Sequence, residues 1–154
     1  MSSQGRYKKI LVPLDGSGWA QRAVPHAVDI ARSHEGSEVI LLNVFTPPAR
    51  EYADQIALAG ANDQAQTTRE QMKQYLIGLR SELRSENVTV RTHLIEGTGV
   101  ASLICNYVAS EGIDLVEMST HGRTGLSRLL FGSVAKNVME CLNVPVLLIQ
   151  PDKE

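Results

Sequence analysis

The stretch from Gly122 to Ser133 has residue types that could bind an anion. Two glycine sites, Gly122 and Gly132, bracket a short apolar segment, and Ser133 follows the second one. Gly122 would let backbone N–H groups approach phosphate oxygens without a Cβ in the way, and the Ser133 hydroxyl would donate a further hydrogen bond. These residues therefore predict a cradle that fits phosphate groups.

The local structure around Gly132 has two interpretations. In the first, one amphipathic helix runs through the segment and Gly132 is a tolerated weak point. In the second, the helix breaks at Gly132, and Ser133 begins a new helix whose unpaired N–H groups and positive dipole end bind the anion. Helical spacing is kept throughout by Leu126, Leu129, Leu130, Val134, Val138 and Cys141.

Three polar side chains near this stretch also have open roles. Asp15 ends the first apolar run, where its carboxylate could accept hydrogen bonds from ribose hydroxyls or a base amino group, or could cap the helix that follows. Arg123 could add positive charge to a phosphate or lie in solvent on a turn. A histidine beside a turn, such as His121, usually caps a helix end or lies in solvent. His26, His34 and His93 are not placed to share a metal with it.

Spacing argues against other common sites. A dinucleotide fingerprint would need a third glycine at Gln21, and a nucleophile elbow would need glycine at Asp15. A P-loop would need a lysine, and a phospho-receiver domain would need an aspartate where Leu94-Ile95-Glu96 stands. We expect neither a metal site nor catalytic residues, and we expect Cys105 and Cys141 to be separate structural thiols rather than a disulfide.

The elements that must position these residues alternate between strand and helix. Strands are predicted at 10–14, 39–45, 88–94, 114–118 and 145–149. One helix should follow Ser17 as its N-cap and reach Ala31, and another should begin after Thr98 and close at Gly112. The alternation predicts a single domain over 1–154, α/β in class, with a doubly wound five-stranded parallel sheet and helices on both faces. Ligands of such folds bind beyond the carboxyl ends of the strands.

The amino-acid composition argues against some classes of binding partner. The 154 residues carry 15 basic and 17 acidic side chains, a formal charge of -2 and only 5% aromatics, which argues against nucleic acid. No apolar run approaches the roughly 20 residues of a membrane helix, and the polar start lacks the core of a signal peptide. We therefore expect a cytoplasmic protein without membrane insertion.

Taken together, these segments resemble the universal stress protein family, whose ATP-binding members carry glycine, two residues, glycine, nine residues, then glycine with serine or threonine. Gly122, the nine residues 123–131 and Gly132-Ser133 fit the later part, and Ile10-Leu-Val-Pro-Leu-Asp15 resembles the family's opening strand. Ser119 replaces the first glycine. The likeness covers essentially the whole chain, including the ending Asn143-Val-Pro-Val-Leu147.

This resemblance implies ATP as ligand, with or without Mg²⁺. Asp15 and Val44 would contact the adenosine, with Pro13 and Met118 lining the site beside Ser119 and Arg123. The phosphates would be held by Gly122, Gly132, Ser133 and Val134. The family also implies strand order 3-2-1-4-5, a homodimer through strand five, a regulatory protein partner, and little or no catalysis.

Two other functions remain open. Ser119 is the best support for a dimeric interaction protein of the same fold that binds no nucleotide, and a slow adenine-nucleotide hydrolase is the third hypothesis. Glu117 is an oddity, because a carboxylate within a central strand needs either a partner or a position that faces solvent.

Overall fold

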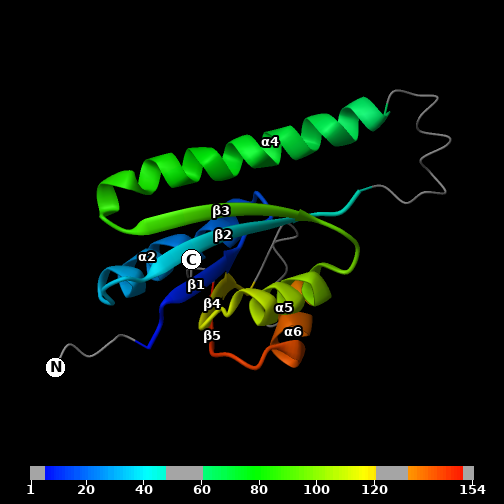
Figure 1. The fold of residues 1–154 in the computed structure, drawn as a ribbon. Helices are drawn as coiled ribbons and strands as arrows, with labels where there is room; N and C mark the ends of the chain where they lie inside the picture. The colour runs from blue at the N-terminus through cyan, green and yellow to red at the C-terminus, as the bar shows by residue number, and fades with distance from the viewer. Residues whose placement is uncertain (1–5, 48–60, 121–131, 151–154) are drawn as a thin grey trace.

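The computed structural model describes residues 6–47, 61–120 and 132–150, and it contains a five-stranded sheet (Figure 1). All strand pairs are parallel, and the order is β3-β2-β1-β4-β5, which confirms the predicted architecture. The strands are β1 (Lys9–Pro13), β2 (Glu38–Phe45), β3 (Thr89–Glu96), β4 (Leu115–Ser119) and β5 (Val146–Ile149).

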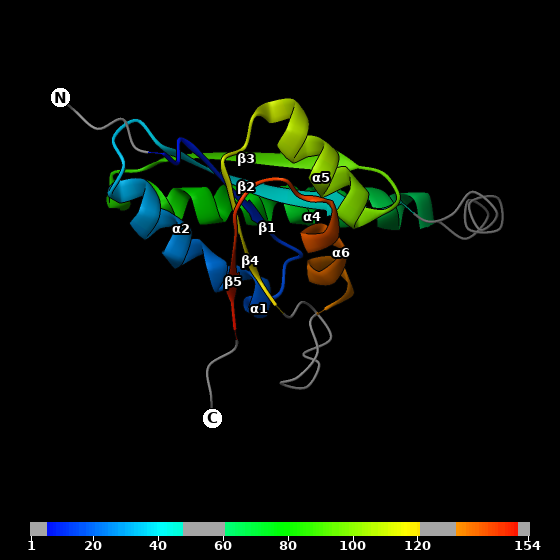
Figure 2. The same cartoon turned by 90° about the horizontal axis from the view of Figure 1, so that it is seen from below.

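Helices cover both faces of this sheet. The helical elements are α1 (Gly18–Gln21), α2 (Ala23–Arg32), α4 (Ala61–Glu82), the 3-10 turn η1 (Leu83–Glu86), α5 (Val100–Glu111) and α6 (Ser133–Cys141). Apolar side chains of α1, α2 and α4 share one core with the sheet, while those of α5 and α6 share a second core. Figures 1 and 2 show α5 and α6 beside each other on one side of the sheet, with α2 and α4 on the other.

The strands form because their side chains are buried on both faces. Ile10 and Leu11 follow each other on β1, are both 0% exposed, and belong to the two different cores. Strand β3 instead alternates exposed and partly buried residues, and it lies at an edge as its sequence pattern predicts. Because β1 contributes buried side chains to the cores on both faces, it lies in the middle of the sheet.

Two helix predictions are wrong in detail. The helix expected from Ser17 to Ala31 is divided at Arg22, because Pro25 has no N–H to donate to the preceding turn and so fits only near a helix start. The helix expected to begin at Thr98 has Gly99 as its N-cap, with φ of 77° and no side-chain cap. Glycine adopts this left-handed conformation readily, and the chain enters α5 through it.

The prediction of separate thiols is also wrong, since Cys105 of α5 and Cys141 of α6 form a disulfide. Their Cα atoms are 6.2 Å apart, within the usual range for a disulfide. The cysteines are 36 residues apart in sequence, and only the packing of α5 against α6 brings them together. Spacing along the chain does not reveal such a contact.

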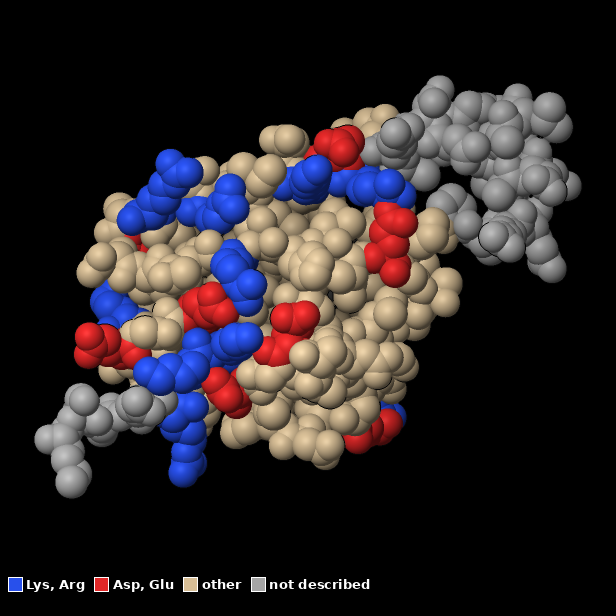
Figure 3. Space-filling model, in the orientation of Figure 1, with Lys and Arg blue, Asp and Glu red and all other residues tan. Residues whose placement is uncertain are grey.

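The face shown in Figure 3 carries positive and negative side chains mixed together over α4 and the strands, while the part over α5 and α6 carries few charges. Ion pairs join Arg91 to Glu38 at 2.9 Å and Arg69 to Glu96. Within the described part of the chain, no helix combines the length and the apolar character that crossing a membrane requires.

Candidate functional site

A pocket of about 470 Å³ opens at the carboxyl ends of β1, β2 and β4. The first turns of α5 and α6 form one wall, and α4 contributes Thr68 and Met72 to another. Its size lies within the range of small-molecule sites, and its place is where doubly wound folds bind ligands. The strand ends and the turns after them contribute Pro13, Leu14, Asp15, Leu42, Asn43, Val44, Phe45, Thr46, Met118, Ser119 and Thr120.

The turn after β1 orients the carboxylate of Asp15. The Ser17 backbone N–H donates a 2.9 Å hydrogen bond to Asp15 Oδ1. The cap of α1 is the Ser17 side chain, whose Oγ accepts the Ala20 N–H at 3.1 Å. Gly16 lies between them with φ of 86°, a conformation that glycine adopts without strain. Ser17 therefore caps the helix as predicted, and Asp15 lines the pocket.

The first turn of α6 also lines the pocket. The helix begins at Ser133, and no described side chain caps it at Gly132. The Gly132 N–H donates to the Thr120 carbonyl at 2.7 Å, and the Thr120 N–H donates to the Ile149 carbonyl at 3.0 Å. These bonds tie the helix start to the ends of β4 and β5. The prediction that a helix begins at Ser133 is therefore confirmed.

Most residues predicted for the site lie around this one pocket. The lining includes Pro13, Asp15, Val44, Met118, Ser119, Gly132, Ser133 and Val134. The other two predicted residues, Gly122 and Arg123, lie outside the described residues, as does His121. The pocket thus brings together residues from four separate segments of the chain.

Other lining residues were missed by the sequence analysis. The Asn43 side chain is buried, and its Nδ2 donates a 2.8 Å hydrogen bond to the Leu14 carbonyl, which joins the ends of β2 and β1. A lone polar residue in an otherwise apolar strand was the signal for it. Thr68, Met72, Val100 and Ile104 follow ordinary helical patterns, so only tertiary packing shows that they line the pocket.

The charge of the pocket is set by few groups. Among the described lining residues, Asp15 is the acidic one and there is no lysine or arginine. Burial, and then the negative charge of Asp15, raises the pKa of Tyr75 on the adjacent α4. An anion here would therefore meet main-chain N–H groups and the positive end of α6 rather than a described cationic side chain.

Glu117 lies on β4, and it has neither a partner among the described residues nor a position that faces solvent. It is 0% exposed, and neither carboxylate oxygen has a hydrogen-bond partner among the residues that the structure describes. Its side chain points to the same face of β4 as Leu115, toward α1 and α2. Burial, and secondarily the charge of Asp29, raises its pKa to about 7. The expectation of a partner or a solvent-facing position is therefore wrong.

Metal-ligating side chains do not gather in the described part of the chain, where no three His, Cys, Asp or Glu residues are placed to hold an ion. The groups that could hold a cofactor are instead those of the pocket. Asp15 and Val44 line it from the ends of β1 and β2, and Ser133 and Val134 line it from the start of α6. This arrangement offers an acceptor for hydroxyl or amino groups and donors for an anion.

Known proteins of one family are similar to this chain along nearly its whole length. Residues 6–150 match the model of the universal stress protein family. The chain is 30% identical to universal stress protein MJ0577 of Methanocaldococcus jannaschii, with 94% of this chain and 95% of that protein covered. It is 28% identical to universal stress protein MJ0531 of the same organism, with 99% and 88% covered.

Solved structures with similar folds also include universal stress proteins. The structure of MJ0577 superposes with a TM-score of 0.81 at 29% identity, covering 97% of this chain and all of that one. UspA from Lactobacillus plantarum has a TM-score of 0.74 at 25% identity, covering 94% and 99%. A universal stress protein from Archaeoglobus fulgidus was solved with dAMP, and it shares this fold at a TM-score of 0.62 and 23% identity, covering 94% and 99%. With a family match along nearly its whole length, this chain belongs to the universal stress protein family.

Proposed function

We propose that this protein is an ATP-binding regulator of the stress response, with little or no catalysis. The observation that carries the proposal is the pocket that Asp15 and Val44 line together with the start of α6 at Ser133. Adenosine would lie against Asp15 and Val44, and the phosphates against Gly132, Ser133 and Val134. Mg²⁺ would accompany the phosphates, if it is required, as part of the ligand.

Physical chemistry favours an anion at this helix start. The first N–H groups of a helix have no acceptors within the helix, and the dipole makes this end positive. Ser133 adds a hydroxyl donor, and the main chain at Gly132 has no Cβ to keep phosphate oxygens away. The solved relative with dAMP supports a nucleotide as the ligand class.

The binding experiment uses gently purified protein. Mass spectrometry of released small molecules should detect an adenine nucleotide, and calorimetric titration with Mg-ATP should show saturable binding. In Gly132→Val, a branched side chain would occupy the phosphate cradle, and we expect affinity to fall by about tenfold or more. The φ of -58° and ψ of 151° at Gly132 suit valine, so backbone strain is not expected.

Gly78→Val on α4 is the matched control, because Gly78 is exposed and a Cβ there meets no atom of the described residues within 4 Å. Its affinity should equal that of the unmodified protein. If neither co-purified nucleotide nor titratable binding is found, the ATP-binding proposal fails, and an interaction protein without nucleotide is favoured. Steady ATP turnover that Gly132→Val abolishes would instead favour a hydrolase.

We also propose a cytoplasmic homodimer that pairs through β5 and presents a nucleotide-dependent surface to a regulatory protein. Strand β5 is at the edge of the sheet, and its Leu147 side chain is 38% exposed. Leu147→Lys should shift the protein toward monomer in sedimentation analysis, whereas Lys73→Ala on the exposed side of α4 should not. A dimer that is unaffected by Leu147→Lys would place the interface elsewhere.

A further inference from the structure

The disulfide between Cys105 and Cys141 joins two helices that both line the pocket. Val100 and Ile104 line it from α5, just before Cys105, and Ser133 and Val134 line it from the start of α6, which ends at Cys141. The loop closed by the disulfide also contains β4 with its pocket residues Met118 and Ser119. A cross-link here restrains the wall of the pocket that we propose for phosphate.

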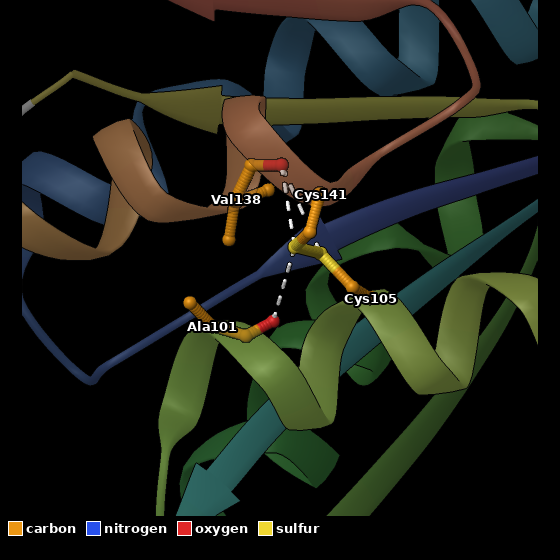
Figure 4. Close-up of a disulfide and its surroundings, with 4 residues drawn as sticks. All are labelled: Ala101, Cys105, Val138 and Cys141. Atoms are coloured by element: carbon orange, nitrogen blue, oxygen red, sulfur yellow. Dashed lines mark hydrogen bonds between the residues drawn. A yellow bond between two sulfur atoms is a disulfide. The ribbon is translucent and has the colours of Figure 1, made fainter.

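The two cysteine residues differ in exposure. Cys141 is exposed at the end of α6, while Cys105 is partly buried. Figure 4 shows the disulfide between the two helices, with the carbonyl groups of Val138 and Ala101 beside it. The Val138 oxygen is 3.7 Å from Cys105 Sγ and 3.6 Å from Cys141 Sγ, and the Ala101 oxygen is 3.9 Å from Cys141 Sγ. After reduction, the two thiols could therefore donate weak hydrogen bonds to these carbonyl oxygens.

The helices do not depend on the disulfide to stay together. Ile104 and Tyr107 of α5 and Ala135 and Val138 of α6 belong to one buried apolar cluster. Reduction would remove the covalent restraint but leave this packing. The dithiol form is therefore expected to be folded, with greater freedom at the start of α6.

We infer that Cys105 and Cys141 form a redox modification site, and that its disulfide state raises nucleotide affinity. This inference rests on the proposed ATP binding. With the disulfide formed, α5 and α6 hold the pocket walls before ligand arrives, so binding loses less conformational entropy. Disulfides are rare in cytoplasmic proteins, and those that form are usually transient and catalytic or redox-sensing, which fits the exposed position of Cys141.

An external dithiol can reduce the disulfide, and hydrogen peroxide can form it again. A thiolate of the dithiol attacks the accessible Cys141 sulfur and displaces the Cys105 thiolate, which takes up a proton. The second thiol of the reductant resolves the mixed disulfide, so the protein gains two electrons and two protons in all. In reverse, one cysteine thiolate attacks peroxide to give a sulfenic acid and hydroxide, which is protonated to water, and the other cysteine displaces a second water.

The experiment compares the full chain in its two redox states. Peroxide gives the oxidised form and a dithiol reductant the reduced form, with alkylation and mass spectrometry to count thiols. Calorimetry with Mg-ATP should show about fivefold or more weaker binding after reduction. The double variant Cys105→Ser, Cys141→Ser should bind like the reduced form and should not respond to reductant.

Hydrogen exchange provides a readout that needs no nucleotide. Reduction should speed amide exchange at residues 133–141, whereas exchange in β1 should not change. Equal ATP affinity or equal exchange in the two states would overturn the redox inference, as would a disulfide found only between chains. Absence of ATP binding in both states, with the exchange difference present, would instead refute the proposed nucleotide function and the affinity effect inferred from it.

Discussion

The buried carboxyl of Glu117 makes a prediction about how stability depends on pH. Its pKa is about 7 in the folded protein, against an ordinary value of 4.5. The folded state therefore holds the proton more tightly than the unfolded state. As pH rises from about 4.5 through 7, the unfolded state loses this proton first, and the free energy of unfolding falls.

The size of this effect follows from the difference in pKa. One pKa unit corresponds to about 1.4 kcal/mol, so ionised Glu117 lowers the free energy of unfolding by at most about 3 kcal/mol at pH 8. Glu117→Gln removes the titration and preserves the shape of the side chain. We expect this variant to be close to the unmodified protein at pH 5 and more stable by up to about 3 kcal/mol at pH 8.

Urea denaturation followed by circular dichroism between pH 5 and 8 measures this difference. All other ionisable groups are present in both proteins, so their contribution cancels in the comparison. Glu70→Gln, at an exposed position on α4, is the matched control and should follow the unmodified protein. Parallel pH profiles for Glu117→Gln and the unmodified protein would refute the reasoning.

Two further predictions concern stability. Reduction of the Cys105–Cys141 disulfide should lower the free energy of unfolding by about 3 to 4 kcal/mol, because the bond closes a loop of 36 residues in the unfolded chain; urea denaturation with and without reductant measures this. Asn43→Ala should lower it by about 1 to 3 kcal/mol, because the buried bond to the Leu14 carbonyl is lost; thermal unfolding followed by circular dichroism measures this.

Each of these predictions has a control. The double variant Cys105→Ser, Cys141→Ser should match the reduced protein and be insensitive to reductant, and a protein whose stability is the same with and without reductant would contradict the loop argument. Asn106→Ala changes an exposed asparagine on α5 and should unfold close to the unmodified temperature. Equal losses in the two asparagine variants would show that the buried bond is not the cause.

The sheet was predictable because its strands carry a strong local signal. Continuous apolar runs such as the one at Ile10 to Leu14 require burial on both faces, and that requirement is visible along the chain. The break at Gly132 was visible as one of two interpretations. Packing was needed to choose between them, since Leu129, Leu130 and Val134 keep helical spacing across the glycine.

What could not be predicted depends on contacts between distant segments. Cys105 and Cys141 read as separate apolar positions until α5 and α6 are placed together. Thr68 and Met72 belong to a helix whose pattern shows only which side is apolar, not that it borders a pocket. The α1–α2 break was missed because the helical spacing of small residues continues through Arg22, although Pro25 was present as a signal.

The central claim is that the start of α6 holds the phosphates of ATP, and a crystal structure with Mg-ATP tests it most directly. We predict phosphate oxygens within hydrogen-bond distance of the Ser133 N–H and hydroxyl groups, with the adenosine beside Asp15 and Val44. A nucleotide bound at another surface, or an empty pocket at a saturating concentration of ATP, would contradict the account.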